Sequence, residues 1–248
     1  MTTPRTVFIP VPDTDFDVTE VSVPWKLLVE AGHNVVFLTE HGGKPPAADP
    51  LLLSGVIFGQ LGADPEPKRF YAELSQTRAF QEPMPWSALD PGGADALLLP
   101  GGHAPGMRQY LGNTQLQDRV AKFFESGKPV AAICHGVLLA ARSKGHDGKS
   151  VLAQRRTTCL PKYMERTAYF LTAWKLGRYY RTYPLYVEDE VKLALAQESQ
   201  FERGPRTLSK RGTRADDAPA FTVEDGQYVS ARWPGDAYLF GKQLLARL

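Results

Sequence analysis

Cysteine is scarce in this chain of 248 residues, which contains only Cys134 and Cys159. Two cysteines are too few for a disulfide framework. Neither belongs to a CxxC pair, and a zinc site would need a fuller set of ligands, so no metal site is expected. A reactive role for a single thiol in a reducing compartment remains open.

An excess of charge of one sign is also absent. The 29 lysines and arginines nearly balance the 27 aspartates and glutamates, and the formal net charge is +2. The stretch 155–214 is richer in basic residues, but its charges are scattered and are interrupted by the acidic run 187–190. This pattern favours a solvated face, so no nucleic-acid partner is expected.

Long apolar runs are missing as well. No segment approaches the ~20 residues of a membrane span, so no membrane partner is expected. Residues 1–5 lead directly into a strand pattern and lack the apolar region of a secretory signal, which predicts a cytoplasmic protein. A hydrophobic fraction of 43% is ordinary for a globular protein of this length.

What the sequence does contain is a series of short apolar runs of strand length, separated by helical patterns. These runs lie at 6–11, 34–38, 94–99 and 129–133. The β-α-β alternation predicts a mostly parallel sheet with helices on both faces. We therefore expect an α/β fold of the flavodoxin-like, three-layer sandwich type, in a single domain over 1–248.

Helix signals fill the gaps between the strands. A short turn carrying Glu20 is expected before a helix from Pro24 to Ala31, because proline fits a first helical turn. An extended segment is expected from Val151 to about Cys159. Further elements are expected as a hairpin at the Asp-Gly pair 225–226 and as helices at about 67–81, 113–126, 136–142, 187–195 and 234–248.

Two segments interrupt the alternation of strands and helices. Residues 40–92 are rich in proline and glycine, which predicts an insertion near the open end of the sheet. Residues 161–185 are dense in aromatic side chains at partly helical spacing. They predict a helical cap whose aromatics are mostly packing residues, with a lid over the site as a second interpretation.

Cys134 ends the apolar run 129–133, and a helical pattern follows at once. Residues 132–136 (AICHG) have the form small-x-nucleophile-x-Gly, which is typical of a sharp turn between a strand and a helix. A thiol at this position gains backbone donors and the positive end of a helix, both of which lower its pKa. A buried structural cysteine is the alternative.

Three motifs occur together: Glu20 four residues before Pro24, the run 98–103 (LLPGGH) and the run 131–136 (AAICHG). They resemble the ThiJ/PfpI superfamily, which is related to class I glutamine amidotransferases. Within it the chain looks most like the branch of heat-shock chaperones and glutathione-independent glyoxalases. The run 230–234 (SARWP) gives weaker support, and the resemblance covers most of the chain.

The resemblance implies a role for each matching residue. Cys134 would be the nucleophile, and His135 would be its neighbouring acid or base. Glu20 would approach the sulfur as a protonated carboxylic acid that shuttles protons. The backbone N–H groups of Gly102 and His103 would help to form an oxyanion hole.

Two of these residues have a structural alternative. Glu20 closes the sequence 17–20, which has the spacing of a capping box, so it could simply cap a helix. Glu165 lies about thirty residues after the cysteine, where family members place an acidic partner for the histidine. It could equally be a charge on a helix surface.

The function implied is an enzyme, a glyoxalase III-like lyase or a hydrolase, acting on a small carbonyl compound through Cys134. A 2-oxoaldehyde would become a 2-hydroxy acid by way of a hemithioacetal, with no cofactor required. An amidase or peptidase with an acyl-cysteine intermediate would use the same residues. A redox-sensing stress chaperone is an alternative of another class.

The chain also departs from the branch. Residues 104–106 (APG) follow the GGH motif, where the branch usually has a glycine, and Thr-Gly is missing before Glu20. Because these positions frame the substrate, the particular substrate of relatives is not carried over. Relatives often form dimers, which makes a homodimer possible, although no interface can be recognised in the sequence.

Overall fold

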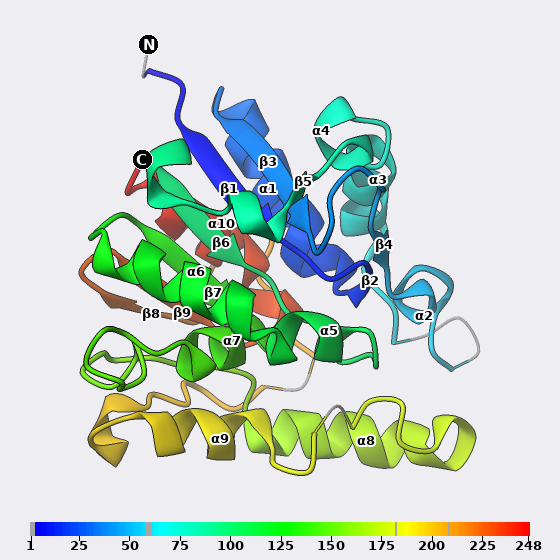
Figure 1. Ribbon diagram of the computed structural model, residues 1–248. Coiled ribbons are helices and arrows are strands. Elements are labelled where there is room, and N and C mark those ends of the chain that lie inside the picture. The colour runs from blue at the N-terminus through cyan, green and yellow to red at the C-terminus, as the bar shows by residue number, and fades with distance from the viewer. Residues whose placement is uncertain (1–2, 58–60, 182, 208) are drawn as a thin grey trace.

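A seven-stranded sheet forms the centre of the protein. The computed structural model describes residues 3–57, 61–181, 183–207 and 209–248, and the sheet runs through its middle (Figure 1). The strand order is β5-β3-β1-β6-β7-β9-β8, and every pair is parallel except β8 with β9. The strands are β1 (Thr6–Pro10), β3 (Asn34–Thr39), β5 (Met84–Pro85), β6 (Ala96–Leu99), β7 (Val130–Ile133), β8 (Thr222–Asp225) and β9 (Tyr228–Ala231).

The central strands are buried on both faces, as their uninterrupted apolar sequences predict. All residues of β6 and β7 are buried. Parallel pairing of β1 with β6 and of β6 with β7 places their carboxyl ends at one edge of the sheet. Open α/β sheets bind ligands at this edge.

Helices cover both faces of the sheet, which confirms the expected α/β sandwich. Helix α1 packs against α3 and α10, and α7 packs against α5 and α6. Figure 1 shows α5, α6 and α7 in front of the sheet, with α1 and α10 behind it. The bounds are α1 (Val18–Glu30), α3 (Pro65–Leu74), α5 (Met107–Gly112), α6 (Thr114–Glu125), α7 (Gly136–Arg142) and α10 (Ala237–Leu245).

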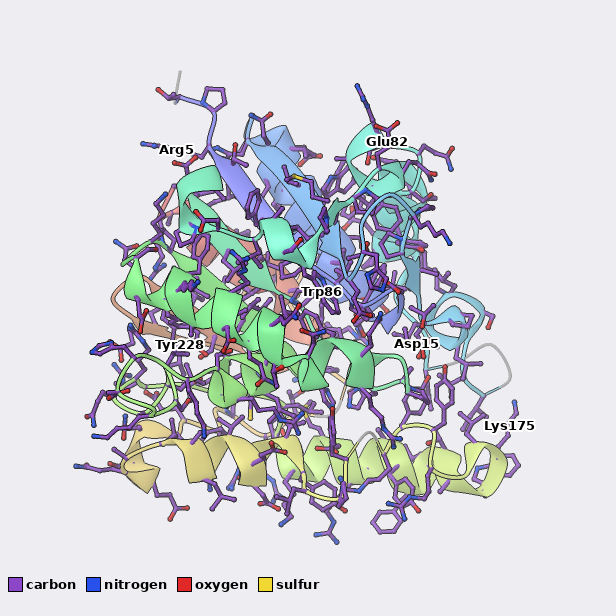
Figure 2. The ribbon with its side chains drawn as sticks, viewed as in Figure 1. Arg5, Asp15, Glu82, Trp86, Lys175 and Tyr228 are labelled. Atoms are coloured by element: carbon purple, nitrogen blue, oxygen red, sulfur yellow. The ribbon has the colours of Figure 1, made fainter. Side chains whose placement is uncertain are left out.

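Large side chains fill the space between these layers. Trp86 and Tyr228 are buried, whereas Glu82 reaches the surface (Figure 2). The indole Nε1 of Trp86 donates to the carbonyl of Leu38 at 3.1 Å, and the Tyr228 hydroxyl pairs with the Thr157 hydroxyl at 3.0 Å. The polar atoms of both aromatics are therefore satisfied, as burial requires.

Helix α1 begins earlier than the position of Pro24 predicts. The Asp17 carboxylate accepts the backbone N–H groups of Thr19 at 2.8 Å and Glu20 at 3.1 Å, so the helix starts at Val18. Pro24 lies inside the helix, and its missing N–H leaves the Glu20 carbonyl without the usual helical donor. The expected turn before Pro24 was wrong, because the N-cap and the buried apolar face outweigh one proline.

Two other expected segments also differ. The expected helix over 67–81 is divided into α3 and α4 (Arg78–Gln81). Residues 151–155 form turns instead of an extended segment, and the bridge of Thr157 with Phe201 follows them. The sheet has no free position for a strand there, because β9 already occupies the side of β7 that faces away from β6.

The aromatic-rich segment forms α8 (Lys162–Leu176), and α9 (Val187–Ala194) follows it. Figure 1 shows both helices as a layer beneath the sandwich, and α9 packs on α7. The expected insertion over 40–92 contributes α2 (Pro50–Ser54) and β4 (Ala47–Ala48), which pairs with β2 (Thr14–Phe16). Residues 58–60 of the insertion and residue 182 of the cap lie outside the described residues.

Within the described part of the chain, no helix combines the length and the apolar character needed to cross a bilayer.

Candidate active site

Cys134 lies at a sharp turn between β7 and α7. Its φ of 58° is in the left-handed region, which costs a non-glycine residue about 1–3 kcal/mol. Helix α7 begins at Gly136, where a Cβ atom would lie 2.0 Å from the carbonyl oxygen of Leu99. The expected elbow is therefore present, and glycine is required where the helix passes the neighbouring strand.

The loop after β6 packs directly against this elbow. A Cβ atom on Gly101 would lie 2.6 Å from the backbone nitrogen of His135 and 3.0 Å from the Cβ of Cys134. The Gly101 N–H donates to Oε2 of Glu20 at 2.8 Å, and the Gly101 carbonyl accepts from the Asp17 N–H at 2.9 Å. Gly101 thus joins the start of α1 and the end of β6 to the elbow.

Glu20 is fully buried in the first turn of α1. A Cβ atom on Gly101 would lie 2.9 Å from Oε2 of Glu20 and 3.0 Å from the Cβ of Cys134, so the carboxyl group lies beside the Cys134 side chain. The capping-box alternative does not hold, because the Asp17 N–H that a reciprocal cap would bind is taken by Gly101. Among the described residues, Oε1 of Glu20 has no partner of hydrogen-bonding geometry. This oxygen is available for proton exchange with the sulfur or with a substrate.

Burial sets the protonation of these acids. Burial, followed by the neighbouring Asp17 carboxyl, raises the pKa of Glu20 well above its ordinary value. Burial and then Glu20 raise the pKa of the Cys134 thiol, so the lowering expected from its position at the elbow was wrong; the backbone N–H of His135 acts in the lowering direction but is outweighed by burial. Burial also raises the pKa of Asp17 to about 6. The raised pKa values favour the protonated form of both Glu20 and Cys134, and they disfavour the ionisation of both together.

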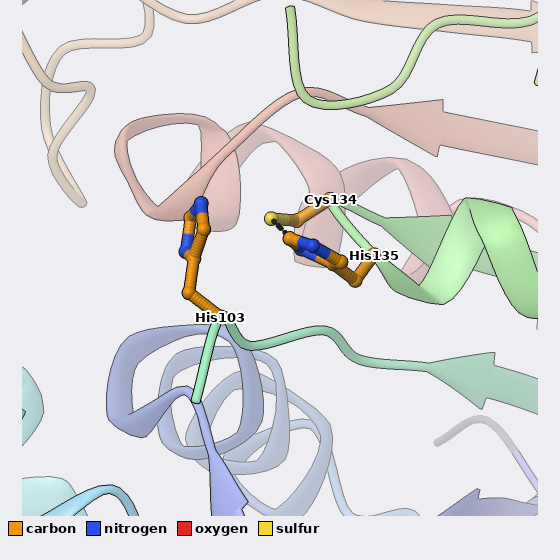
Figure 3. Close-up of side chains that lie close together, drawn as sticks. All are labelled: His103, Cys134 and His135. Atoms are coloured by element: carbon orange, nitrogen blue, oxygen red, sulfur yellow. Dashed lines mark hydrogen bonds between the residues drawn. The ribbon is translucent and has the colours of Figure 1, made fainter. Parts of the chain in front are cut away.

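His135 and His103 complete the group of reactive side chains around the sulfur (Figure 3). Nδ1 of His135 lies 3.5 Å from Sγ of Cys134, and the two imidazole rings meet edge to face with centroids 4.8 Å apart. Burial lowers the pKa of His103 to about 4. Burial, helped by His103 and nearby arginines, lowers the pKa of His135 well below its usual range. Both rings are thus neutral at physiological pH.

Gly102 and His103 lie in the same loop as Gly101, and we expect their backbone N–H groups to bind an oxyanion. A Cβ atom on Gly102 would lie 2.7 Å from the carbonyl oxygen of Asp15, so the loop is held closely against the chain that enters α1. The structure places this loop beside Cys134 (Figure 3). The role of its amides stays a prediction.

Glu165 makes different contacts from those of a triad residue. It is buried in α8, where Oε1 accepts from Arg181 at 2.9 Å and Oε2 accepts from the Val187 N–H at 2.9 Å. In the described part of the chain, none of its hydrogen bonds reaches His135. Both oxygens fasten α8 to the chain that enters α9, which favours a structural role; the triad role stays a prediction.

We expect Glu165→Gln to lower the free energy of unfolding by about 3 kcal/mol, because the largely buried Arg181 loses its anionic partner. Turnover per folded molecule should change by less than about threefold. Thermal unfolding and steady-state kinetics on the same preparation measure the two effects. A hundredfold loss of kcat at unchanged Tm would instead show that Glu165 orients His135.

Asp49 makes a contact that the sequence did not reveal. Its side chain is buried and accepts from the hydroxyls of Tyr179 and Tyr180, each at 3.1 Å. Asp49 is also the N-cap of α2, and its side chain accepts from the Leu51 N–H, so an Asp-Pro pair is the one local sign of its position. This contact fastens the segment after α8 to the insertion, and it holds the Tyr180 ring edge to face against His103 at a centroid distance of 5.9 Å.

A mostly apolar pocket of about 310 Å³ lies between α8, the insertion and the segment that joins β9 to α10. One part of its wall is His103, which connects it to Cys134. Asp17 and Arg211 are its charged side chains. The apolar wall includes Leu52, Val56, Leu160, Met164, Leu171 and Trp233. Its size and character are those of a site for a small organic molecule.

The fold and the site define an α/β protein with a cysteine at a strand–helix elbow and a buried glutamate beside it. The family model described as ThiJ/PfpI family-like matches residues 11–205, and the chain belongs to this family. The family expected from the three sequence motifs is confirmed.

Individual relatives extend this result. The chain is 29% identical over 246 residues to an uncharacterized protein of Schizosaccharomyces pombe, covering 95% of this chain and 81% of that protein. It is 26% identical over 235 residues to a deglycase of Pyrococcus abyssi, covering 94% and 93%. Glyoxalase III from Candida albicans has the same fold, with a TM-score of 0.69 at 18% identity over 98% of this chain and 97% of that chain.

Proposed function

We propose that this protein is a cysteine-dependent enzyme that converts a small 2-oxoaldehyde into the corresponding 2-hydroxy acid. The observation that carries the proposal is the position of Cys134, held in a strained elbow beside the buried carboxyl of Glu20. A nucleophile beside a buried acid suits addition to a carbonyl group. Similarity to deglycases supports chemistry of this kind.

The first step joins Sγ of Cys134 to the aldehyde carbon of the substrate. The thiol proton passes to the aldehyde oxygen, which gives a hemithioacetal. While negative charge develops on that oxygen, the backbone N–H groups of Gly102 and His103 would stabilise it.

The second step moves a proton between adjacent carbons. A base removes the hydrogen from the former aldehyde carbon, and an enediol forms; the base is the neutral ring of His135 or the small ionised fraction of Glu20. Return of a proton to the neighbouring carbon, with loss of the hydroxyl proton, leaves a 2-hydroxy thioester. Water then cleaves the bond between sulfur and carbon, which releases the 2-hydroxy acid and restores the thiol. The reaction consumes one water and needs no external oxidant or reductant.

The pocket favours a substrate with an apolar substituent larger than a methyl group. In a series of 2-oxoaldehydes of increasing alkyl length, we expect kcat/KM to rise about fourfold for each methylene buried, which corresponds to about 0.8 kcal/mol. The measurement is chromatographic detection of the 2-hydroxy acid. Met164→Ala, which shortens the apolar wall, should reduce the advantage of long substrates more than the rate with methylglyoxal.

Two outcomes of the same panel would count against this proposal. Equal or falling kcat/KM with chain length would show that the pocket does not receive the substituent. Turnover of amides with no turnover of any 2-oxoaldehyde would favour the hydrolase with an acyl-cysteine intermediate.

The surroundings of Cys134 count against redox sensing. A sensor thiol is typically solvent-accessible and has a low pKa. Cys134 has no exposed surface, and burial raises the pKa of its thiol.

A further inference from the structure

Three metal-binding side chains converge at the elbow. The ligand atoms of His103, Cys134 and His135 all lie within 4.8 Å of one another (Figure 3). His103 comes from the loop after β6, whereas the other two come from the elbow after β7, so the group is formed by the fold and not by a sequence motif. In the sequence, Cys134 and His135 are adjacent but His103 lies about thirty residues earlier, so the sequence alone did not predict a metal site.

The distances suit a small tetrahedral ion. With Zn–S near 2.3 Å and Zn–N near 2.0 Å, a sulfur and a nitrogen bound to one zinc ion are roughly 3.5 Å apart. Sγ of Cys134 and Nδ1 of His135 are 3.5 Å apart. An imidazole has two nitrogens, so His103 can ligate through one of them and keep a contact through the other. The ligand atoms of the three residues lie within 4.8 Å of one another, so the His103 ring would have to move inward to reach the ligand spacing of roughly 3.5 Å that zinc requires.

We propose that Cys134, His135 and His103 bind a thiophilic d¹⁰ cation, Zn²⁺ above all, with the fourth coordination position open. Binding of the ion does not depend on the proposed reaction, because it concerns the resting side chains alone; only the inhibitory effect of the ion rests on the proposed function. One thiolate and two neutral imidazoles form a borderline-soft ligand set that favours zinc over magnesium or calcium, which prefer oxygen ligands.

Binding would switch the nucleophile off. The Cys134 thiol gives up one proton to solvent as the sulfur–zinc bond forms, so a lone pair of the sulfur becomes a bond to the metal. A metal-bound sulfur cannot add to an aldehyde carbon at the rate of the free thiolate. Zinc would therefore act as a reversible inhibitor that enters by the pocket ending at His103.

The test is direct titration of the purified protein with Zn²⁺ against a chromophoric chelator, and with Co²⁺ as a spectroscopic probe. We expect one ion per chain, a thiolate-to-cobalt charge-transfer band and the visible bands of tetrahedral Co²⁺. Cys134→Ser should abolish the charge-transfer band, and His103→Ala should weaken zinc binding by about 100-fold or more. Cys159→Ser, which alters the other buried thiol, should leave both measurements unchanged.

Surface binding and misfolding have their own controls. His146 is an exposed histidine beside Glu125, so His146→Gln measures any zinc bound at the surface. In the wild-type protein, Zn²⁺ should slow alkylation of Cys134 by iodoacetamide, and a chelator should restore the rate. Bound Co²⁺ without a thiolate band, zinc affinity unchanged in a folded His103→Ala variant, or alkylation unaffected by saturating Zn²⁺ would overturn the proposal.

Discussion

Cys134→Ser is expected to lower kcat/KM for the best 2-oxoaldehyde by at least about 10³-fold, the scale of loss seen when an enzyme loses its nucleophile. The serine hydroxyl has nearly the same size as the thiol but ionises far less readily, so the elbow is preserved while the nucleophile is lost. Steady-state kinetics with detection of the 2-hydroxy acid measures the effect.

Cys159→Ser is the matched control, because Cys159 is the other cysteine of the chain and is equally buried. It should retain turnover per folded molecule. Mass spectrometry of the wild-type protein quenched during turnover should find the substrate mass on the peptide that contains Cys134. If Cys134→Ser retained wild-type turnover, the whole mechanism through the sulfur would be wrong.

Glu20→Gln is expected to lower kcat by about 10² to 10⁴-fold, the usual contribution of a positioned acid or base. The amide oxygen of glutamine can still accept a hydrogen bond from the Gly101 N–H, so the 2.8 Å hydrogen bond that Glu20 accepts from Gly101 is preserved. The amide cannot carry a proton between the two substrate carbons. The hemithioacetal on Cys134 should therefore accumulate and be visible as an added mass on the intact protein.

Three further readouts separate proton transfer from a general loss of structure. Alkylation of Cys134 by iodoacetamide should continue in Glu20→Gln at a rate within about tenfold of the wild type. The Tm at neutral pH should be unchanged or higher, because a buried carboxyl with a raised pKa is costly to ionise in the folded state. Glu165→Gln is the same carboxyl-to-amide change in the cap, and it should instead lower the Tm and leave turnover per folded molecule nearly unchanged. A Glu20→Gln variant with near-normal kcat would assign the proton transfer to His135.

Local sequence was informative where a local steric or packing rule applies. The form small-x-Cys-x-Gly predicted the elbow, because a strand and a helix can meet at so sharp a turn only if Gly136 has no side chain. The central strands could also be predicted from the sequence, because strands buried on both faces need uninterrupted apolar sequences. Pro24 gave a wrong prediction of where the helix begins, because its local preference for a first turn was outweighed by the Asp17 cap and by packing.

Contacts between distant segments could not be predicted in the same way. Glu20 fitted a capping box as well as an active site, and the choice depends on Gly101, whose carbonyl takes the Asp17 N–H and whose own N–H binds the glutamate. Glu165 contacts Arg181, and Asp49 contacts two tyrosines. These contacts join segments that are distant in the sequence, and no hydrophobic periodicity predicts that such segments meet.

The sequence by itself thus determined the family, the parallel sheet and the cysteine at the turn, because spacing and side-chain size along the chain specify them. Only the tertiary structure decided what surrounds the sulfur. The fold brings the Glu20 carboxyl, the His103 ring and an apolar pocket to the carboxyl edge of the sheet. Burial at that edge then sets the protonation of each group, and burial is a property of the packed molecule and not of any residue in the sequence.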